Sequence, residues 1–315
     1  MKNKKVLITG GAGFIGSNFV YKFLDLGCKI NVVEKEKANF WRLKEVKNKI
    51  KIDLVDLENY DKIELFVAKT KPDIILHFAT YGVFQARQQD IKITISTNLL
   101  GTINLVNACS KINFECFINT GSASEYGAKD KLMEENDLLE PNNLYGITKV
   151  ASTLYCQYMA RKTGLPIVTA RLSAPYGYFE EKGRLIPTII KSCLENGDLN
   201  LSSPASVRDF IFIEDIVTAY LEIIENIQKV KGEIFNIGPG VQTTIDQVVN
   251  IIKEITHSSV EPKYGQIKPA QIEPKNWLSN ISKIKKILGW QPRYSLEKGL
   301  EKNISWFKKN INLYN

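Results

Sequence analysis

Short apolar runs alternate with stretches of helical periodicity along the first half of the chain. The apolar runs cover residues 6–8, 30–33, 74–76, 116–118 and 167–168. They are too short for helices, and in the segments between them apolar residues recur every three or four positions. Strands that alternate with helices in this way predict a parallel sheet covered on both faces. We therefore expect an α/β fold with a doubly wound parallel sheet of the Rossmann type.

The pattern loosens after Arg171, where prolines and glycines interrupt it (Pro175, Gly177, Gly183 and Pro187). We place a dinucleotide-binding domain at residues 1–172 and a smaller α/β domain, mainly for the substrate, at residues 173–315. Within the second domain, a strand is predicted at 208–213, a helix at 214–226 and a strand at 234–238. These segments near 208–238 could return to the first domain.

Two long predicted helices differ in their apolar faces. The helix from about residue 90 to 113 carries apolar side chains on several sides, which predicts burial against the sheet and against a second surface such as a partner subunit. We expect a homodimer. In the helix from about residue 145 to 162, the residues at core spacing are Ile147, Val150, Ala151, Leu154, Tyr158 and Met159. That stripe leaves Lys149 and Ser152 on another side of the helix.

The first apolar run enters a glycine-rich turn, Thr9-Gly10-Gly11-Ala12-Gly13-Phe14-Ile15-Gly16, which a helical segment follows. Glycines three apart allow a sharp turn and a close approach to a pyrophosphate, whose charge a helix N-terminus favours. Glu34 ends the second strand about 20 residues later, where a carboxylate binds the ribose 2′-OH and repels a 2′-phosphate. We predict a site for NAD(H) in preference to NADP(H), although Lys35 and Lys37 would tolerate a phosphate.

Composition describes an ordinary globular protein, with 44% hydrophobic and 24% charged residues among 315. No stretch approaches about 18 uninterrupted apolar residues, and no apolar leader precedes the first strand, so we expect no membrane segment and a cytoplasmic location. Five widely spaced cysteines with only two histidines predict buried thiols and no metal site. The formal charge of +8 is spread along predicted helix faces, so nucleic acid is not expected as a partner.

Tyr145 and Lys149 are the first candidates for chemistry, because a four-residue spacing on a helix places both side chains on one face. A phenol has a pKa of about 10, and a neighbouring ammonium together with a cationic nicotinamide ring would lower it. Other pairs share the spacing (Tyr158/Lys162, Tyr178/Lys182, Tyr264/Lys268 and Tyr294/Lys298). Ser122 distinguishes the first pair, because it lies just past a predicted strand, at the sheet edge where ligands of α/β folds bind. Its hydroxyl could then hydrogen-bond the reacting oxygen beside Tyr145.

The glycine turn, Ser122, Tyr145 and Lys149 together resemble the extended short-chain dehydrogenase/reductase family, the NAD-dependent epimerases, dehydratases and reductases of nucleotide sugars. Later segments are similar too, in the family's order: Arg171 with Tyr176-Gly177, Arg208-Asp209-Phe210 with Asp215, Phe235-Asn236-Ile237-Gly238, and Leu288-Gly289-Trp290-Gln291-Pro292. The resemblance spans nearly the whole chain. It implies catalytic roles for Ser122, Tyr145 and Lys149, and a nucleotide-diphosphate sugar as substrate.

The resemblance also implies which residues contact each ligand. Those for the cofactor are Gly10, Gly13, Phe14, Ile15 and Gly16 at the pyrophosphate, Glu34 at the ribose, Asp56 and Leu57 at the adenine, and Phe78, Ala79, Thr80, Asn98, Thr120, Tyr145, Lys149 and Leu172 along the rest of the molecule. Those for the substrate are Tyr81, Ser122, Ser124 and Arg208. Arg208 would grip the diphosphate through bidentate contacts. Ala174 departs from the family, which usually has an asparagine there that bonds the substrate phosphate.

The residues after Ser122 narrow the reaction. By resemblance, 4,6-dehydratases carry an acidic residue one or two places after the catalytic hydroxyl residue, where this chain has Ala123 and Ser124. Glu125 would point to the other face of an extended segment, so a dehydratase is disfavoured. Residues 77–82, 185–190 and 208–215 look most like the CDP-paratose/abequose synthases, and a 4-reductase of an NDP-4-keto-6-deoxyhexose is the first hypothesis. A 4-epimerase with tightly bound NAD is the alternative, and a non-catalytic NAD-binding protein is the third.

Overall fold

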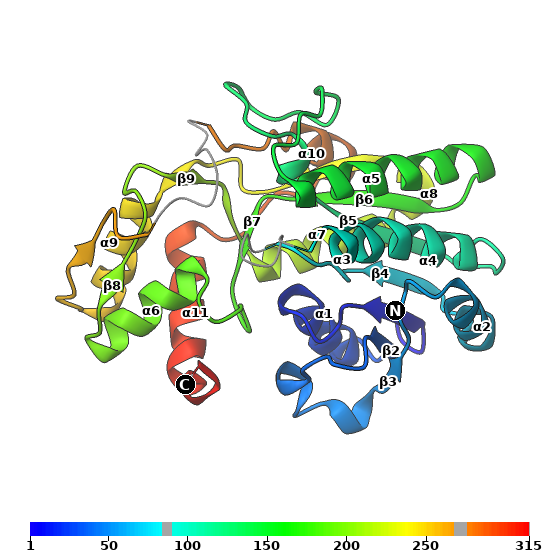
Figure 1. The fold of residues 1–315 in the computed structure, drawn as a ribbon, viewed down its shortest axis with the longest axis horizontal. Coiled ribbons are helices and arrows are strands. Elements are labelled where there is room, and N and C mark those ends of the chain that lie inside the picture. The colour runs from blue at the N-terminus through cyan, green and yellow to red at the C-terminus, as the bar shows by residue number, and fades with distance from the viewer. Residues whose placement is uncertain (84–89, 268–275, 315) are drawn as a thin grey trace.

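A seven-stranded parallel sheet organises the chain in the computed structural model, which describes residues 1–83, 90–267 and 276–314 (Figure 1). Its strands are β1 (Lys5–Thr9), β2 (Lys29–Glu34), β3 (Lys51–Leu54), β4 (Ile74–His77), β5 (Cys116–Ser122), β6 (Ile167–Leu172) and β11 (Ile234–Ile237). Their order is β3-β2-β1-β4-β5-β6-β11, with every neighbouring pair parallel. The predicted fold class is confirmed. The strand order reverses between β1 and β4, and ligands of such sheets bind at the carboxyl ends of the strands beside this reversal.

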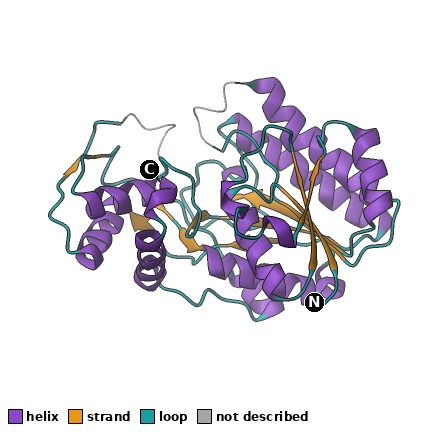
Figure 2. Cartoon of the chain, turned by 90° about the horizontal axis from the view of Figure 1, so that it is seen from below, coloured by secondary structure: helices purple, strands orange, loops and turns teal. Residues whose placement is uncertain are grey.

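The two faces of the sheet bury alternate residues of each strand. Leu7 of β1 packs under α2 (Tyr60–Thr70), α4 (Gly101–Cys109) and α5 (Leu144–Thr163). Its neighbours Val6 and Ile8 point the other way, toward α1 (Phe14–Asp25) and α7 (Ile213–Glu225). Figure 2 shows the strands between these two helical layers. The near-continuous apolar runs in the sequence follow from burial on both faces.

The predicted helix at about residues 90–113 is interrupted. It consists of α3 (Ile91–Ile95), a π-helical segment η4 (Ser96–Leu100) and α4, which ends at Cys109. The wider π turn brings Asn98, only 2% exposed, inward to the carboxyl end of the sheet. Single π turns inside helices often occur at functional sites.

The prediction for the core face of α5 was wrong for most of its residues, although Met159 is buried as predicted. Ile147, Leu154 and Tyr158 are about half exposed, whereas Lys149 and Ser152 are buried. The buried polar groups have hydrogen-bond partners on other elements, because Ser152 donates to the Asn98 carbonyl at 2.7 Å and Lys149 donates to a carbonyl of β5. Hydrogen bonds, which an apolar pattern cannot reveal, therefore decide which face of α5 points inward.

The remaining segments form a smaller part beside the sheet, at the left of Figure 1. It contains the strand pairs β7 (Ala174–Tyr176) with β10 (Phe210–Phe212), β9 (Val207–Arg208) with β12 (Thr243–Thr244), and β8 (Leu199–Asn200) with β13 (Pro262–Lys263), and the helices α6 (Leu185–Glu195), α9 (Ile245–Thr256) and α11 (Leu296–Lys309). The helix α10 (Ser282–Leu288) instead packs beside β11, at the top of Figure 1. The strand predicted at 208–213 is divided at Asp209, whose buried carboxylate accepts hydrogen bonds from Ser173 and from the backbone of Val241 and Ser279. In the described part of the chain, no helix is both long and apolar enough to cross a membrane.

Candidate active site

The glycine turn connects β1 to α1, and steric contacts explain its glycines. Gly10 has a φ of +69°, and a Cβ there would lie 2.6 Å from the backbone nitrogen of Ala79. A Cβ on Gly16 would lie 2.3 Å from the Gly10 carbonyl oxygen, so α1 packs directly on the turn. No side chain caps α1 at Gly13, which leaves the N–H groups of its first turn for an anion. The turn fits the pyrophosphate of a dinucleotide.

Glu34 lies against the same turn. Its Oε1 accepts a hydrogen bond from the Ala12 N–H at 2.6 Å, and burial raises the pKa of its carboxyl above the ordinary value. The next residue, Lys35, donates to Glu58 and Thr97, each at 2.9 Å. Because a carboxylate already engages the Lys35 ammonium, this lysine is less available to a phosphate than the sequence suggested.

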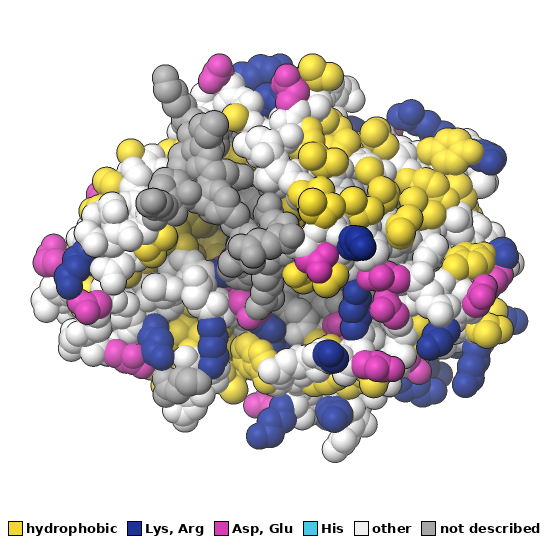
Figure 3. All heavy atoms as spheres, in the orientation of Figure 1, with side chains coloured by type: hydrophobic (Ala, Val, Ile, Leu, Met, Phe, Trp, Pro, Cys, Tyr) yellow, Lys and Arg dark blue, Asp and Glu magenta, His cyan; other side chains and the backbone are white. Residues whose placement is uncertain are grey.

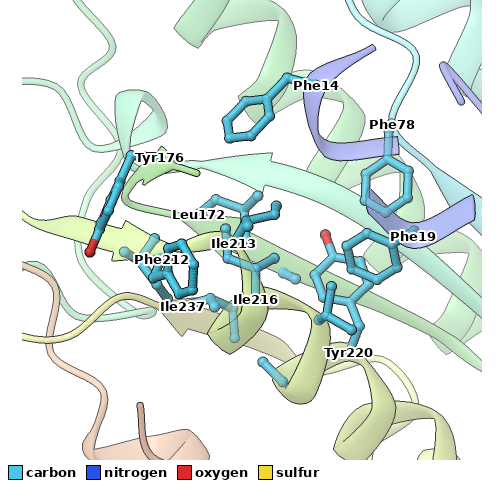
Figure 4. Packing of buried hydrophobic residues seen from close by; sticks show 14 of the residues in the cluster. Phe14, Phe19, Phe78, Leu172, Tyr176, Phe212, Ile213, Ile216, Tyr220 and Ile237 are labelled. Atoms are coloured by element: carbon cyan, nitrogen blue, oxygen red, sulfur yellow. The ribbon is translucent and has the colours of Figure 1, made fainter. Parts of the chain in front are cut away.

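The other predicted cofactor residues lie at or near the carboxyl ends of four strands of the sheet. They are Asp56 and Leu57 after β3, Phe78, Ala79 and Thr80 after β4, Thr120 within β5 and Leu172 at the end of β6. Asp56 is exposed and Leu57 is buried. Figure 4 shows Phe78 and Leu172 within the apolar packing around Ile213 and Tyr220, so the core alone explains these two residues.

A chain of buried polar groups runs from β1 to the π-helical segment. The His77 Nδ1 lies 2.7 Å from the Thr9 hydroxyl, and the Nε2 lies 2.9 Å from the Thr102 hydroxyl. Thr102 donates its proton to the Asn98 carbonyl at 2.6 Å, so it must accept from the His77 Nε2–H. Burial lowers the pKa of His77 to about 3, which keeps the ring neutral.

Asn98 uses its whole side chain within the protein. Its Oδ1 accepts from the Tyr81 N–H at 2.7 Å and the Thr80 hydroxyl at 3.1 Å. Its Nδ2 donates to the Tyr81 carbonyl at 2.9 Å and the Thr148 hydroxyl at 3.0 Å. These bonds fix the loop after β4 against α5, and they support a positioning role for Asn98 rather than direct contact with a cofactor.

Ser122 ends β5 and begins a 3₁₀ turn at Ala123–Glu125. The expectation of an extended segment with Glu125 on its far face was wrong, because the turn folds Glu125 back under Ser122. Glu125 Oε1 accepts from the Ser122 N–H at 2.9 Å, and the Ser122 hydroxyl oxygen accepts from the Ser124 N–H at 3.1 Å. Glu125 is completely buried, and its Oε2 lies 2.8 Å from the Arg171 Nε.

Tyr145 and Lys149 lie one turn apart near the start of α5. The side chains of Ser122 and Thr80 hydrogen-bond the Tyr145 hydroxyl, yet burial raises the pKa of Tyr145 to about 12. The Lys149 Nζ donates to the Thr120 carbonyl at 2.9 Å and lies 5.7 Å from the centre of the Tyr145 ring. Burial also lowers the pKa of Lys149 to about 8. Without a bound nicotinamide the predicted lowering of the Tyr145 pKa is therefore absent, because burial disfavours both charged forms.

The predicted substrate residues fall into two groups. Tyr81 is held by Asn98, and the Ser124 carbonyl packs against Gly146, so both lie beside Tyr145. Arg208 belongs to β9 in the smaller part. Its guanidinium donates to the Val207 carbonyl and lies 5.8 Å from the Trp277 ring.

Sequence reasoning missed the buried groups behind these residues, above all the pairing of Glu125 with Arg171. The signal in the sequence that could have indicated this pairing is the glycine at position 121. A Cβ on Gly121 would lie 2.5 Å from Glu125 Oε1, so the glycine before Ser122 makes room for a carboxylate.

Comparisons with known proteins agree with this fold. The model of the NAD dependent epimerase/dehydratase family matches residues 6–238. A dTDP-D-glucose 4,6-dehydratase from Mus musculus is 29% identical over 98% of this chain and 90% of its own length. A UDP-glucose 4-epimerase from Thermotoga maritima, solved with UDP-glucose, has a TM-score of 0.88 at 27% identity, covering 98% of this chain and 99% of that one. A UDP-glucuronic acid 4-epimerase from Bacillus cereus, solved with UDP-glucuronic acid and NAD, has a TM-score of 0.86 at 26% identity, covering 97% and 99%.

Proposed function

The chain belongs to the NAD dependent epimerase/dehydratase family, whose members act on nucleotide sugars, and we propose that it transfers a hydride between NAD(H) and C4 of a nucleotide-diphosphate hexose. One observation carries the proposal. Ser122, Thr80 and Tyr145 bring three hydroxyls together at the carboxyl end of the sheet, next to the glycine turn and above the buried Lys149. Hydroxyls gathered in this way suit a sugar oxygen that gains or loses a proton.

In this reaction Tyr145 moves the proton at the sugar O4, and Ser122 hydrogen-bonds the same oxygen as its charge develops. Lys149 stabilises the phenolate, and its lowered pKa lets it exchange a proton near neutral pH. The glycine turn and Glu34 would hold NAD, which accepts or supplies the hydride when bound. A cationic nicotinamide ring near Tyr145 would oppose the effect of burial on its pKa.

Elimination of water is disfavoured for a reason more specific than the sequence suggested. Ala123 and Ser124 have no acidic group, and both oxygens of Glu125 are engaged by Ser122, Thr153 and Arg171. A carboxylate held in this way has no free position from which to move a proton on the substrate. We therefore propose oxidation and reduction at C4 without dehydration, although dehydratases occur among the relatives.

Two reactions fit this chemistry. The sequence motifs favour a 4-reductase, in which NADH is consumed by a 4-keto sugar and Tyr145 donates the proton. The relatives named as 4-epimerases favour the second, a 4-epimerase that would hold NAD tightly, in which the hydride removed from C4 returns to the opposite face of the same carbon and no coenzyme is consumed. Since Ser122, Tyr145 and Lys149 serve both, the cofactor balance distinguishes them.

The purified enzyme should be assayed in two ways. A 4-keto-6-deoxy sugar nucleotide with NADH tests the reductase by loss of absorbance near 340 nm, and UDP-glucose or UDP-glucuronic acid with the enzyme as purified tests the epimerase by chromatography. Tyr145→Phe should lower kcat by at least about 100-fold with NAD(H) affinity nearly unchanged. Tyr158→Phe, on the exposed side of the same helix, is the matched control. Near-normal kcat in the Tyr145 variant would remove it from the mechanism.

We also propose that the cofactor is NAD(H) rather than NADP(H). The support is the placement of Glu34 against the turn and the engagement of Lys35 by Glu58. A 2′-phosphate at this position would meet the Glu34 carboxylate. A KM for NADPH equal to or below that for NADH would contradict the preference.

A homodimer is proposed from an exposed apolar surface on the face of α3, η4 and α5. Its residues are Ile91, Ile95, Leu100, Ile147, Leu154 and Tyr158, which are between 37% and 60% exposed. Figure 3 shows apolar side chains gathered over this region. Large contiguous apolar patches are rare on monomeric soluble proteins, and protein–protein interfaces are one of the sites that they mark. Ile147→Glu with Leu154→Glu should convert a dimer to a monomer in light scattering, and an unchanged mass would place the interface elsewhere.

A further inference from the structure

A buried ion pair behind Ser122 connects β5 to β6. The Glu125 Oε2 and the Arg171 Nε are 2.8 Å apart, and both side chains are at most 1% exposed. The Arg171 Nη1 continues to the Tyr126 hydroxyl at 2.9 Å. Burying two charges costs free energy that their attraction repays only in part, so stability is a weak explanation for this pair.

The other oxygen of Glu125 connects β5 to the catalytic helix. Its Oε1 accepts from the Ser122 N–H at 2.9 Å and from the Thr153 hydroxyl at 3.1 Å. Thr153 lies one turn after Lys149 on α5. One carboxylate therefore binds the backbone of Ser122, the helix that carries Tyr145 and Lys149, and the arginine of β6.

Gly121, the residue before Ser122, provides the space for the Glu125 carboxylate. A Cβ on Gly121 would lie 2.5 Å from Glu125 Oε1 and 3.0 Å from the Arg171 Cγ. Any side chain at this position would push Glu125 away from Ser122.

We propose that Glu125, paired with Arg171, is a positioning residue that holds the Ser122 hydroxyl at a fixed distance from Tyr145. This inference rests on the proposed function. It touches neither cofactor nor reacting atoms. It acts through the Ser122 backbone on one side and through Thr153 of α5 on the other. The transition state needs both hydroxyls on the same oxygen, so small displacements of either one reduce turnover.

The charge of Glu125 has a second, measurable effect. The titratable groups that face it are Arg171 from β6, Tyr126 from its own turn, and Tyr145, Lys149 and Cys156 from α5. Burial is the larger effect on both groups: it raises the pKa of Tyr145 and lowers that of Lys149. The negative charge of Glu125 raises both pKa values, so it adds to burial at Tyr145, where Arg184 acts in the opposite direction, and it opposes burial at Lys149. Removing this charge should lower both pKa values and move the pH profile of kcat/KM to lower pH.

Three variants test the proposal. Glu125→Gln keeps the shape without the charge, and it should lower kcat by at least about 10-fold and shift the pH profile to lower pH, with NAD(H) affinity unchanged. Glu125→Asp keeps the charge but not the reach, so it should lower kcat without shifting the profile. Thr153→Val removes one donor and no charge, and should cause the smallest loss of kcat, with an unshifted profile.

The outcomes distinguish a failure of the positioning role from a failure of the proposed function. If the wild type is active and the Glu125→Gln variant has the same kcat and the same pH profile, the positioning role is overturned. If the Gln variant does not fold, as judged by its thermal transition, unchanged kcat in the Asp variant would overturn it. A wild type that turns over none of the nucleotide sugars tested would instead overturn the proposed function.

Discussion

Replacing Lys149 with methionine is expected to stabilise the protein while abolishing its activity. The lysine is 5% exposed, and burial lowers its pKa from 10.5 to about 8. That fall corresponds to about 3 kcal/mol, at about 1.4 kcal/mol for each pKa unit. Since the pKa is lower in the folded protein, this free energy opposes folding wherever the lysine is protonated in both states.

The effect on stability has a defined pH dependence. Below about pH 8 the buried lysine is charged, and its burial destabilises the folded protein by the full amount. Between about pH 8 and 10.5 the lysine of the folded protein loses its proton before that of the unfolded chain, and the destabilisation disappears. Methionine removes the cost but also the hydrogen bond to the Thr120 carbonyl, worth about 1 kcal/mol. The net gain is therefore about 2 kcal/mol at pH 7, and it becomes a loss of about 1 kcal/mol above pH 10.5.

Thermal unfolding followed by circular dichroism at pH 7 and pH 9.5 measures both the gain in stability and its pH dependence. At pH 7 the melting temperature should rise by about 4 °C, and most of the rise should vanish at pH 9.5. Lys162→Met, on the exposed end of the same helix, is the control that should show no such pH dependence. A methionine variant less stable than wild type at pH 7, or a difference equal at both pH values, would refute the reasoning.

Three further predictions concern the ligand sites. Gly16→Ala places a methyl group 2.3 Å from the Gly10 carbonyl, so NAD(H) affinity measured by fluorescence titration should fall by at least about 10-fold, whereas Gly197→Ala, with only a 4.0 Å contact, should leave it unchanged. Arg208→Ala should raise KM for the sugar nucleotide by about 10-fold or more with little effect on KM for the coenzyme; equal effects on both would remove Arg208 from the substrate site. Asn98→Ala removes the hydrogen bonds that tie the loop after β4 to α5, and should cost about 2 kcal/mol in denaturant unfolding and lower kcat more than it changes NAD(H) affinity.

Local patterns in the chain were enough to predict the sheet and the glycine turn and to indicate the candidate catalytic residues. Runs such as residues 74–76 indicate buried strands because both of their faces are apolar, and Gly16 is required by its contacts with Gly10 and Gly11 in the same short turn. These properties depend on residues close together in the sequence. They can therefore be read before the fold is known.

The orientation of α5 could not be read in this way. Its apolar stripe, with Ile147 and Leu154, predicted the buried face, but the inward face carries Lys149 and Ser152. What holds these polar groups inside are carbonyls of Thr120 and Asn98, which lie 29 and 54 residues away in the chain. Periodicity measures apolar spacing, and it contains no information about distant hydrogen-bond partners.

By itself, the sequence determined the fold class, and it indicated the glycine turn and the candidate residues Ser122, Tyr145 and Lys149, because each of these signals depends on local spacing. Only the tertiary structure decided the electrostatics of the site. Burial moves the pKa of Tyr145 up and that of Lys149 down, and Glu125 turns back to pair with Arg171 across 46 residues. The cost of burying a charge depends on every element packed around it, and that packing exists only once the strands and helices have come together.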